Sequence, residues 1–104
     1  MTVRRKPDEC GSMTELRALI DDVDDALFDL FAERMACIHR AAELKRIEHL
    51  PANVPSRVTE VIENARRRAA ERRLDPEFYG SIWRSIVDAA IAEEEKHLGQ
   101  PGGT

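Results

Sequence analysis

Residues 13–46 read MTELRALIDDVDDALFDLFAERMACIHRAAELKR and contain neither glycine nor proline. Apolar residues recur in this stretch at steps of three and four, which is the spacing of one face of an α-helix. The apolar stripe begins with Leu16, Ile20, Val23, Leu27 and Leu30. Ser12, followed three residues later by Glu15, fits a capping box and places the helix start near Met13. The stretch therefore predicts one helix of about 34 residues, roughly 50 Å long.

A single chain of this size cannot cover such a helix along its whole length. The chain has 104 residues, of which 42% are hydrophobic, so it is long enough for one domain with a modest core. A compact domain of this length has a radius of gyration of about 13 Å. The first helix therefore implies a partner chain.

Proline and aspartate mark the boundaries of two further helices. Residues 47–54, which include Pro51, are predicted as a loop, and Pro55 suits the first turn of a second helix. Asp75 and Pro76 fit the cap and first turn of a third helix. The chain is therefore expected to be all-α, with three helices. Its predicted parts are an N-terminal arm over 1–12, a helical domain over 13–98 and a disordered tail over 99–104.

Charge and composition exclude several classes of function. The net charge of −4 argues against a protein that coats nucleic acid or an anionic membrane surface. The arginine-rich stretch over residues 66–73 is interleaved with acidic residues and lacks aromatic platforms, so it is expected to be a solvated helix face. No apolar stretch of 18 residues exists that could cross a membrane. We expect neither nucleic acid nor membrane as a partner.

The cysteines and histidines suggest no disulfide framework and no metal site. Cys10 and Cys37 are expected to be reduced thiols, with Cys37 a small core residue, and the chain is predicted to be cytoplasmic. The histidines, His39, His49 and His97, lack metal-ligand spacing with cysteines or acids. They are expected to be surface or loop residues, with no metal bound.

Two cations on the first helix suggest an anion site. Arg34 continues the apolar stripe, and Lys45 follows it by eleven residues, about three turns, with a Cα separation of roughly 16 Å. Two long side chains leaning toward each other across this gap leave room for a small anion. In the alternative interpretation, Arg34 extends along the apolar surface to water and Lys45 is solvated.

A wider pattern resembles the all-helical chorismate mutase family. It consists of Leu16-Arg17-x-x-Ile20-Asp21-x-x-Asp24, Ala32-Glu33-Arg34, Lys45, Pro51, Arg57 and Leu74-Asp75-Pro76. The resemblance covers about residues 13–98. It implies an intertwined homodimer in which the long first helices pair and each of two active sites is built from both chains.

The resemblance also implies roles for individual residues toward a small dicarboxylate substrate. Arg17 of the partner chain, Arg34 and Arg57 would clamp its carboxylates, because the planar fork of arginine matches a carboxylate. Lys45 and Glu94 would act on its ether oxygen, so the expected catalytic residues are Lys45, Glu94 and Arg34. The implied reaction is a pericyclic rearrangement of chorismate to prephenate, which needs no cofactor.

Helix geometry agrees independently with a shared site. Arg17 lies 17 residues before Arg34, about 25 Å along a straight helix and turned by about 100°. Two arginines so far apart in one chain cannot grip the same small molecule. Across an antiparallel pair of helices they can.

Three positions depart from the family pattern. The chain has Val54 and Val58 where family members commonly carry acids that contact the substrate hydroxyl, and Ala90 where a serine can occur. These three also belong to the expected substrate-binding set. Residues 57–58, residues 91–93 and residues 6–10 of the arm look more like the isochorismate-pyruvate lyase branch of the family, which yields salicylate and pyruvate. A lyase, or a non-catalytic helical dimer that acts as a binding or regulatory module, therefore stays open, as does activation by a larger enzyme partner.

Overall fold

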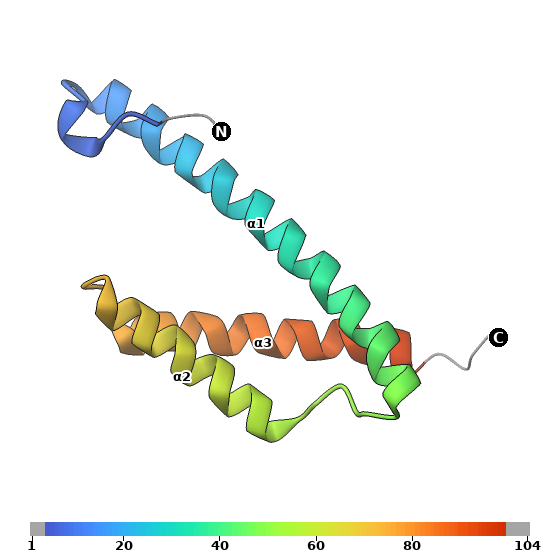
Figure 1. The fold of residues 1–104 in the computed structure, drawn as a ribbon. Helices are drawn as coiled ribbons and strands as arrows, with labels where there is room; N and C mark the ends of the chain where they lie inside the picture. The colour runs from blue at the N-terminus through green and yellow to red at the C-terminus, as the bar shows by residue number, and fades with distance from the viewer. Residues whose placement is uncertain (1–3, 100–104) are drawn as a thin grey trace. The chain divides into compact units, whose positions relative to one another are not determined.

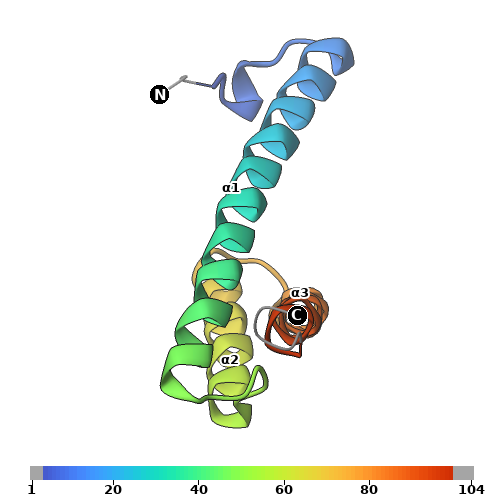
Figure 2. The same ribbon diagram turned by 90° about the vertical axis from the view of Figure 1, so that its right-hand side faces the viewer.

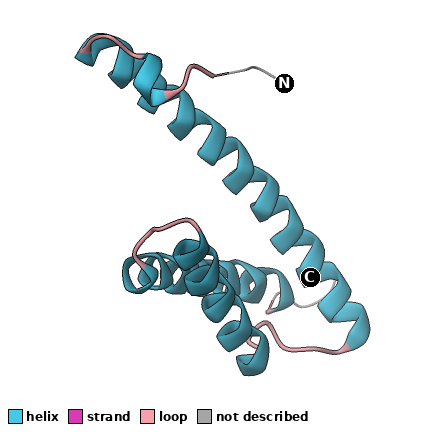
Figure 3. Cartoon of the chain, turned by 60° about the vertical axis from the view of Figure 1, so that its left-hand side comes forward, coloured by secondary structure: helices cyan, strands magenta, loops and turns pink. Residues whose placement is uncertain are grey.

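The computed structural model describes residues 4–99 and is built from helices (Figure 1). No strand occurs within these residues (Figure 3). The prediction of an all-α chain with three long helices is confirmed. In chain order the elements are η1 (Pro7–Glu9), α1 (Met13–Glu48), α2 (Pro55–Glu71) and α3 (Pro76–Leu98).

The terminal segments predicted from the sequence are described only in part. Residues 1–3 of the arm and residues 100–104 of the tail lie outside the described range. The described part of the arm contains the short 3-10 helix η1, in which the Lys6 backbone N–H donates to Glu9 Oε1 at 2.6 Å. The arm therefore has local structure that its sequence did not predict.

The described residues form two compact units, which divide between Ala36 and Cys37. In the first unit, α1 begins at Met13 as predicted, with Ser12 Oγ accepting a hydrogen bond from the Glu15 backbone N–H at 3.2 Å. The Glu15 carboxylate accepts from the Gly11 N–H at 2.9 Å and pairs with Arg5 at 2.7 Å. The expected capping box is therefore half formed, because Glu15 bonds the residue before Ser12.

In the second unit, α2 and α3 lie side by side (Figures 1 and 2). Their contact is made of small and branched side chains, which allow close packing. The buried apolar side chains are those of Ile62, Ala65 and Ala69 of α2 and Val87 and Ala90 of α3. Helix α3 begins as predicted: the Asp75 carboxylate accepts from the backbone N–H groups of Glu77 and Phe78, at 3.0 and 3.4 Å.

Helices α1 and α2 end in the same way. After α1, Leu50 N–H donates to the Lys45 carbonyl at 2.8 Å, and after α2, Leu74 N–H donates to the Ala69 carbonyl at 2.8 Å. These six-to-one bonds define a Schellman motif, whose next-to-last residue adopts the left-handed conformation that favours glycine. Here these residues are His49, with φ of 57°, and Arg73, with φ of 60°.

Apolar side chains of the first unit are exposed to solvent. Phe28 is 71% exposed and packs only edge-on against Phe31, with ring centroids 5.8 Å apart. The other exposed apolar residues of this unit are Met13, Ile20, Val23, Leu27, Leu30 and Met35. Four of these belong to the stripe that predicted the helix. Within residues 4–99, this face of α1 lacks the covering that its apolar character requires.

Two further sequence predictions concern exposure. Cys37 is exposed, so the prediction of a small core residue is wrong for the single chain, because no described segment covers it. Both cysteines are free thiols. In the described part of the chain, none of the helices has a stretch sufficiently long and apolar to cross a bilayer.

Candidate active site

Lys45 and Glu94 are the predicted site residues that the structure joins by a charge contact. Lys45 Nζ lies 2.6 Å from Glu94 Oε1, with the two side chains 21% and 6% exposed. Glu94 Oε1 nevertheless accepts no hydrogen bond of acceptable geometry among the described residues. The contact is therefore an ion pair, held by the attraction between charges rather than by an aligned hydrogen bond. Burial strengthens this attraction, because little water screens it.

The loop after α1 provides a second anchor for Lys45. Its ammonium donates a hydrogen bond to the carbonyl oxygen of Ala52 at 2.7 Å. Ala52 is itself buried, so this part of the loop packs into the second unit, to which it belongs. The neighbouring Arg46 donates to the carbonyl oxygen of His97, near the end of α3. Lys45 therefore reaches the site from a helix end that is tied to both the loop and α3.

The predicted arginine clamps are divided between the two units, with Arg17 and Arg34 in the first and Arg57 in the second. Arg57 is exposed and pairs with Glu60, one turn later on α2. Arg17 is exposed and Arg34 half-buried, and both belong to the first unit. Their predicted roles toward a ligand stay predictions.

Three apolar residues, Ala90, Val54 and Val58, also belong to the predicted site and contribute no charge to it. Ala90 is buried on α3, one turn before Glu94 and therefore on the same face of the helix. Val54 is the cap residue of α2, and its carbonyl accepts from the N–H groups of Arg57 and Val58, at 2.9 and 3.1 Å. Val54 and Val58 are both half-buried. Neither can accept a hydrogen bond from a substrate hydroxyl through its side chain.

A hollow of about 550 Å³ lies beside the loop that follows α1. Lys45 and Arg46 line it, together with the loop residues 49–53 and the end of α3. Glu94 is not among the lining residues.

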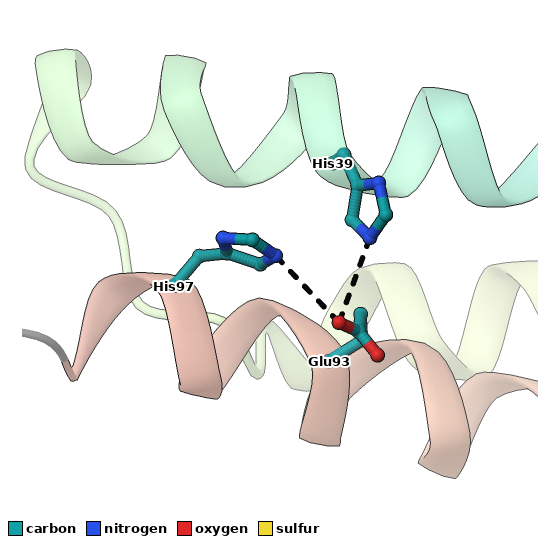
Figure 4. A group of neighbouring side chains, drawn as sticks. All are labelled: His39, Glu93 and His97. Atoms are coloured by element: carbon teal, nitrogen blue, oxygen red, sulfur yellow. Dashed lines mark ion pairs between the residues drawn. The ribbon is translucent and has the colours of Figure 1, made fainter.

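One cluster was not predicted from the sequence. His39 on α1 and His97 on α3 both approach Glu93, with Nε2 to Oε1 distances of 3.5 and 3.6 Å (Figure 4). The histidines are exposed as predicted, but the fold gives His39 and His97 an acidic neighbour, Glu93, that could join them as a metal ligand. The four-residue spacing of Glu93 and His97 was a visible signal, since such pairs share a helix face. His39 is far away in sequence, and only the fold brings it near.

The arrangement of Lys45 and Glu94 suits electrostatic catalysis. A half-buried ammonium held by two oxygens is a preorganised donor for an oxygen on which negative charge develops. A neighbouring carboxyl group either holds the ammonium in place as an anion or donates a hydrogen bond itself when protonated. Both functions serve a reaction that needs positioning and charge stabilisation rather than a nucleophile.

Comparison with known proteins agrees with the resemblance found in the sequence. Residues 16–95, most of the chain including Lys45 and Glu94, match the model of the chorismate mutase type II family. The chain belongs to this family, as its sequence pattern predicted.

Individual relatives of known function carry several related activities. The chain is 32% identical over 87 residues to the 4-amino-4-deoxychorismate mutase of Streptomyces pristinaespiralis, spanning 84% of this chain and 67% of that protein. It is 26% identical over 86 residues to the chorismate mutase of Methanocaldococcus jannaschii, spanning 83% of this chain and 87% of that protein.

Other relatives are much longer proteins. The chain is 32% identical over 93 residues to the bifunctional chorismate mutase/prephenate dehydratase of Aquifex aeolicus, a match that spans 81% of this chain and only 24% of that protein. Its match to the T-protein of Enterobacter agglomerans spans 22% of that protein. No solved structure matches the chain significantly.

Proposed function

We propose that this chain is a chorismate mutase, which rearranges chorismate to prephenate without a cofactor. The observation that carries the proposal is the ion pair between half-buried Lys45 and buried Glu94, which lies within the region that matches the family. The reaction is intramolecular: a C–O bond breaks while a C–C bond forms, and no atom is gained or lost. Such a reaction is accelerated by holding the reactive conformer and by stabilising developing charge.

Lys45 is the principal donor in this mechanism. As the C–O bond breaks, negative charge grows on the ether oxygen, and the ammonium group donates a hydrogen bond to it. Because Lys45 is already oriented by Ala52 and Glu94, little reorganisation accompanies this step. Glu94 donates a second hydrogen bond to the same oxygen when it is protonated.

The site is completed by a second copy of the chain. In this proposal Arg34 and Arg57 of one chain and Arg17 of its partner bind the two substrate carboxylates. The exposed apolar face of the first unit supports a homodimer, because pairing two such faces removes large side chains such as Phe28 from water. The length of α1, 36 residues or about 54 Å, supports the same proposal.

A second candidate is the same rearrangement of an amino analogue of chorismate. One relative is named a 4-amino-4-deoxychorismate mutase, and its match covers two thirds of that protein. Val54 and Val58 offer no side-chain acceptor for a ring hydroxyl, which favours a substrate that is recognised in another way. The lyase reaction on isochorismate and the role of a non-catalytic module stay predictions, as does the cytoplasmic location.

Product analysis distinguishes these functions. We would incubate the chain separately with chorismate, 4-amino-4-deoxychorismate and isochorismate, and identify the products by NMR. Prephenate from chorismate supports the first proposal, and a higher kcat/KM for the amino analogue supports the second. Salicylate and pyruvate from isochorismate would favour the lyase, and no turnover of any substrate would favour the binding module. Lys45→Ala protein serves as the control for contaminating activity.

A further inference from the structure

His39, Glu93 and His97 form a cluster whose shape matches the coordination sphere of a metal ion. Their ligand atoms all lie within 4.8 Å of one another. Both imidazole Nε2 atoms point toward the same carboxylate oxygen, Glu93 Oε1 (Figure 4). Convergence of two nitrogens and one oxygen from two helices distinguishes this cluster from an ordinary surface ion pair.

The lengths of zinc–ligand bonds predict how far apart the ligand atoms of a zinc site lie. Zinc binds histidine nitrogen at about 2.0–2.1 Å and carboxylate oxygen at about 2.0–2.2 Å, so tetrahedral ligand atoms lie roughly 3.3–3.5 Å apart. The observed distances from Glu93 Oε1 to the two nitrogens are 3.5 and 3.6 Å. A small rotation of either exposed imidazole would adjust the remaining distance between the two nitrogens.

The chemistry of the donors selects the class of ion. Two imidazoles and one carboxylate suit zinc and other divalent transition metals, whereas calcium and magnesium prefer oxygen ligands. The histidine side chains are each 46% exposed and the Glu93 side chain 28% exposed, so an ion can enter and water can complete its coordination. Lys96 Nζ lies 3.8 Å from the other oxygen, Glu93 Oε2, and its 72% exposed side chain can turn into solvent.

We propose that His39, Glu93 and His97 bind one divalent transition-metal ion that links α1 to α3. The same helices carry Lys45 and Glu94, and Glu93 is the direct sequence neighbour of Glu94. The ion would thus fix the two helix segments that present the buried ion pair. It would act as a structural clip outside the proposed reaction, because its ligand side chains are 28–46% exposed whereas Glu94 is buried.

The test measures zinc binding to tag-free protein by isothermal titration calorimetry. Cys10→Ser and Cys37→Ser are introduced first, so that free thiols cannot bind the ion. We expect one Zn²⁺ per chain, and at least a tenfold loss of affinity in His39→Ala, His97→Ala and Glu93→Gln variants. His49→Asn is the matched control, because His49 lies outside the cluster and asparagine tolerates its left-handed backbone.

Unfolding provides a second readout that does not depend on activity. At a free zinc concentration of 100 times Kd, the ratio of folded to unfolded protein should rise about 100-fold, and His39→Ala and His97→Ala should abolish this rise. Circular dichroism of each variant without metal checks that it is folded. Wild-type-like zinc affinity in both histidine variants, or no zinc binding by the parent protein, would overturn the proposal.

Discussion

Lys45 carries a charge although its side chain is only 21% exposed, and its two partners explain why the fold tolerates this. Its ammonium contacts one charged oxygen, in Glu94, and one neutral oxygen, in Ala52. A buried charge without a partner is strongly destabilising, whereas a paired one is tolerated. The two residues therefore depend on each other for stability as well as for the proposed chemistry.

Replacing Lys45 should affect turnover more than substrate binding. Lys45→Ala is expected to lower kcat by about 100- to 1000-fold, because losing one preorganised donor typically removes about 2.7–4 kcal/mol of transition-state stabilisation. Steady-state kinetics with the preferred substrate measure the effect. Lys96→Ala, which changes an exposed lysine of α3, is the control and should leave kcat unchanged. A change confined to KM would make Lys45 a general anion anchor instead.

Glu94 is tested by a substitution that keeps a hydrogen-bond donor and removes the charge. If Glu94 acts by donating a hydrogen bond, Glu94→Gln, which keeps a donor, should retain activity, whereas Glu94→Ala should lose it. Comparison of kcat for both variants and the wild-type protein measures this, with Glu95→Gln as an exposed neighbouring control. Loss of activity in Glu94→Gln would exclude the role as a neutral donor.

At the scale of single elements, the start of α3 is the best-defined boundary. The Asp75 side chain accepts hydrogen bonds from two backbone N–H groups that have no partner within the helix. Asp75→Ala is expected to lower the free energy of unfolding by about 1 kcal/mol, and Asp75→Ser by much less. Urea unfolding at one fixed protein concentration measures both. Asp88→Ala, an exposed position in the middle of α3, should have little effect, and an equal loss there would contradict the capping argument.

Helix starts were easier to predict from the sequence than helix ends. Met13, Pro55 and Pro76 begin their helices as predicted, because caps and first-turn prolines are local signals. The first helix was expected to end near Arg46 but continues to Glu48. Its end is formed by His49 in a left-handed conformation, without the glycine that usually marks such an end.

The part of the candidate site that follows the family pattern could be predicted from the sequence. Lys45 and Glu94 were placed together through the resemblance, and the structure joins them. The cluster of His39 with Glu93 and His97 was missed, because contacts between residues far apart in sequence depend on how helices pack. The sequence pattern shows the face on which a side chain lies, but not its neighbour across the interface.

At the scale of the whole molecule, the exposed apolar face of the first unit supports the proposed homodimer. If each active site contains residues of both chains, a mixed dimer of two inactive variants should regain activity. Arg17→Ala and Arg34→Ala homodimers should each be nearly inactive. A dimer with one chain of each kind would have one site with both substitutions and one site with neither.

Refolding the two variants together should therefore restore activity. Random pairing gives half mixed dimers, each with one intact site, so about a quarter of wild-type activity should return. Sedimentation equilibrium should give twice the chain mass of 11.8 kDa, and mass spectrometry should show that mixed dimers form. Mixed dimers without recovered activity would mean that both arginines act within one chain.

His49 and Arg73, at the ends of α1 and α2, adopt a left-handed conformation, and glycine at such positions should raise the free energy of unfolding. Arg73→Gly should increase the free energy of unfolding by less than about 1 kcal/mol, because relief of the left-handed conformation is partly offset by a more flexible unfolded chain. Denaturant unfolding measures the gain. Arg68→Gly, within α2, should instead destabilise the protein, and a gain there would contradict the conformational explanation.

The same reasoning applies to His49, which lies outside the proposed metal cluster. Natural proteins are rarely at their stability optimum, since selection removes only variants that fall below what function needs. A relative living at higher temperature could gain stability at these two bends without altering Lys45, Glu94 or the apolar face of α1. Glycine at both positions is therefore the simplest starting point for a heat-resistant form of this enzyme.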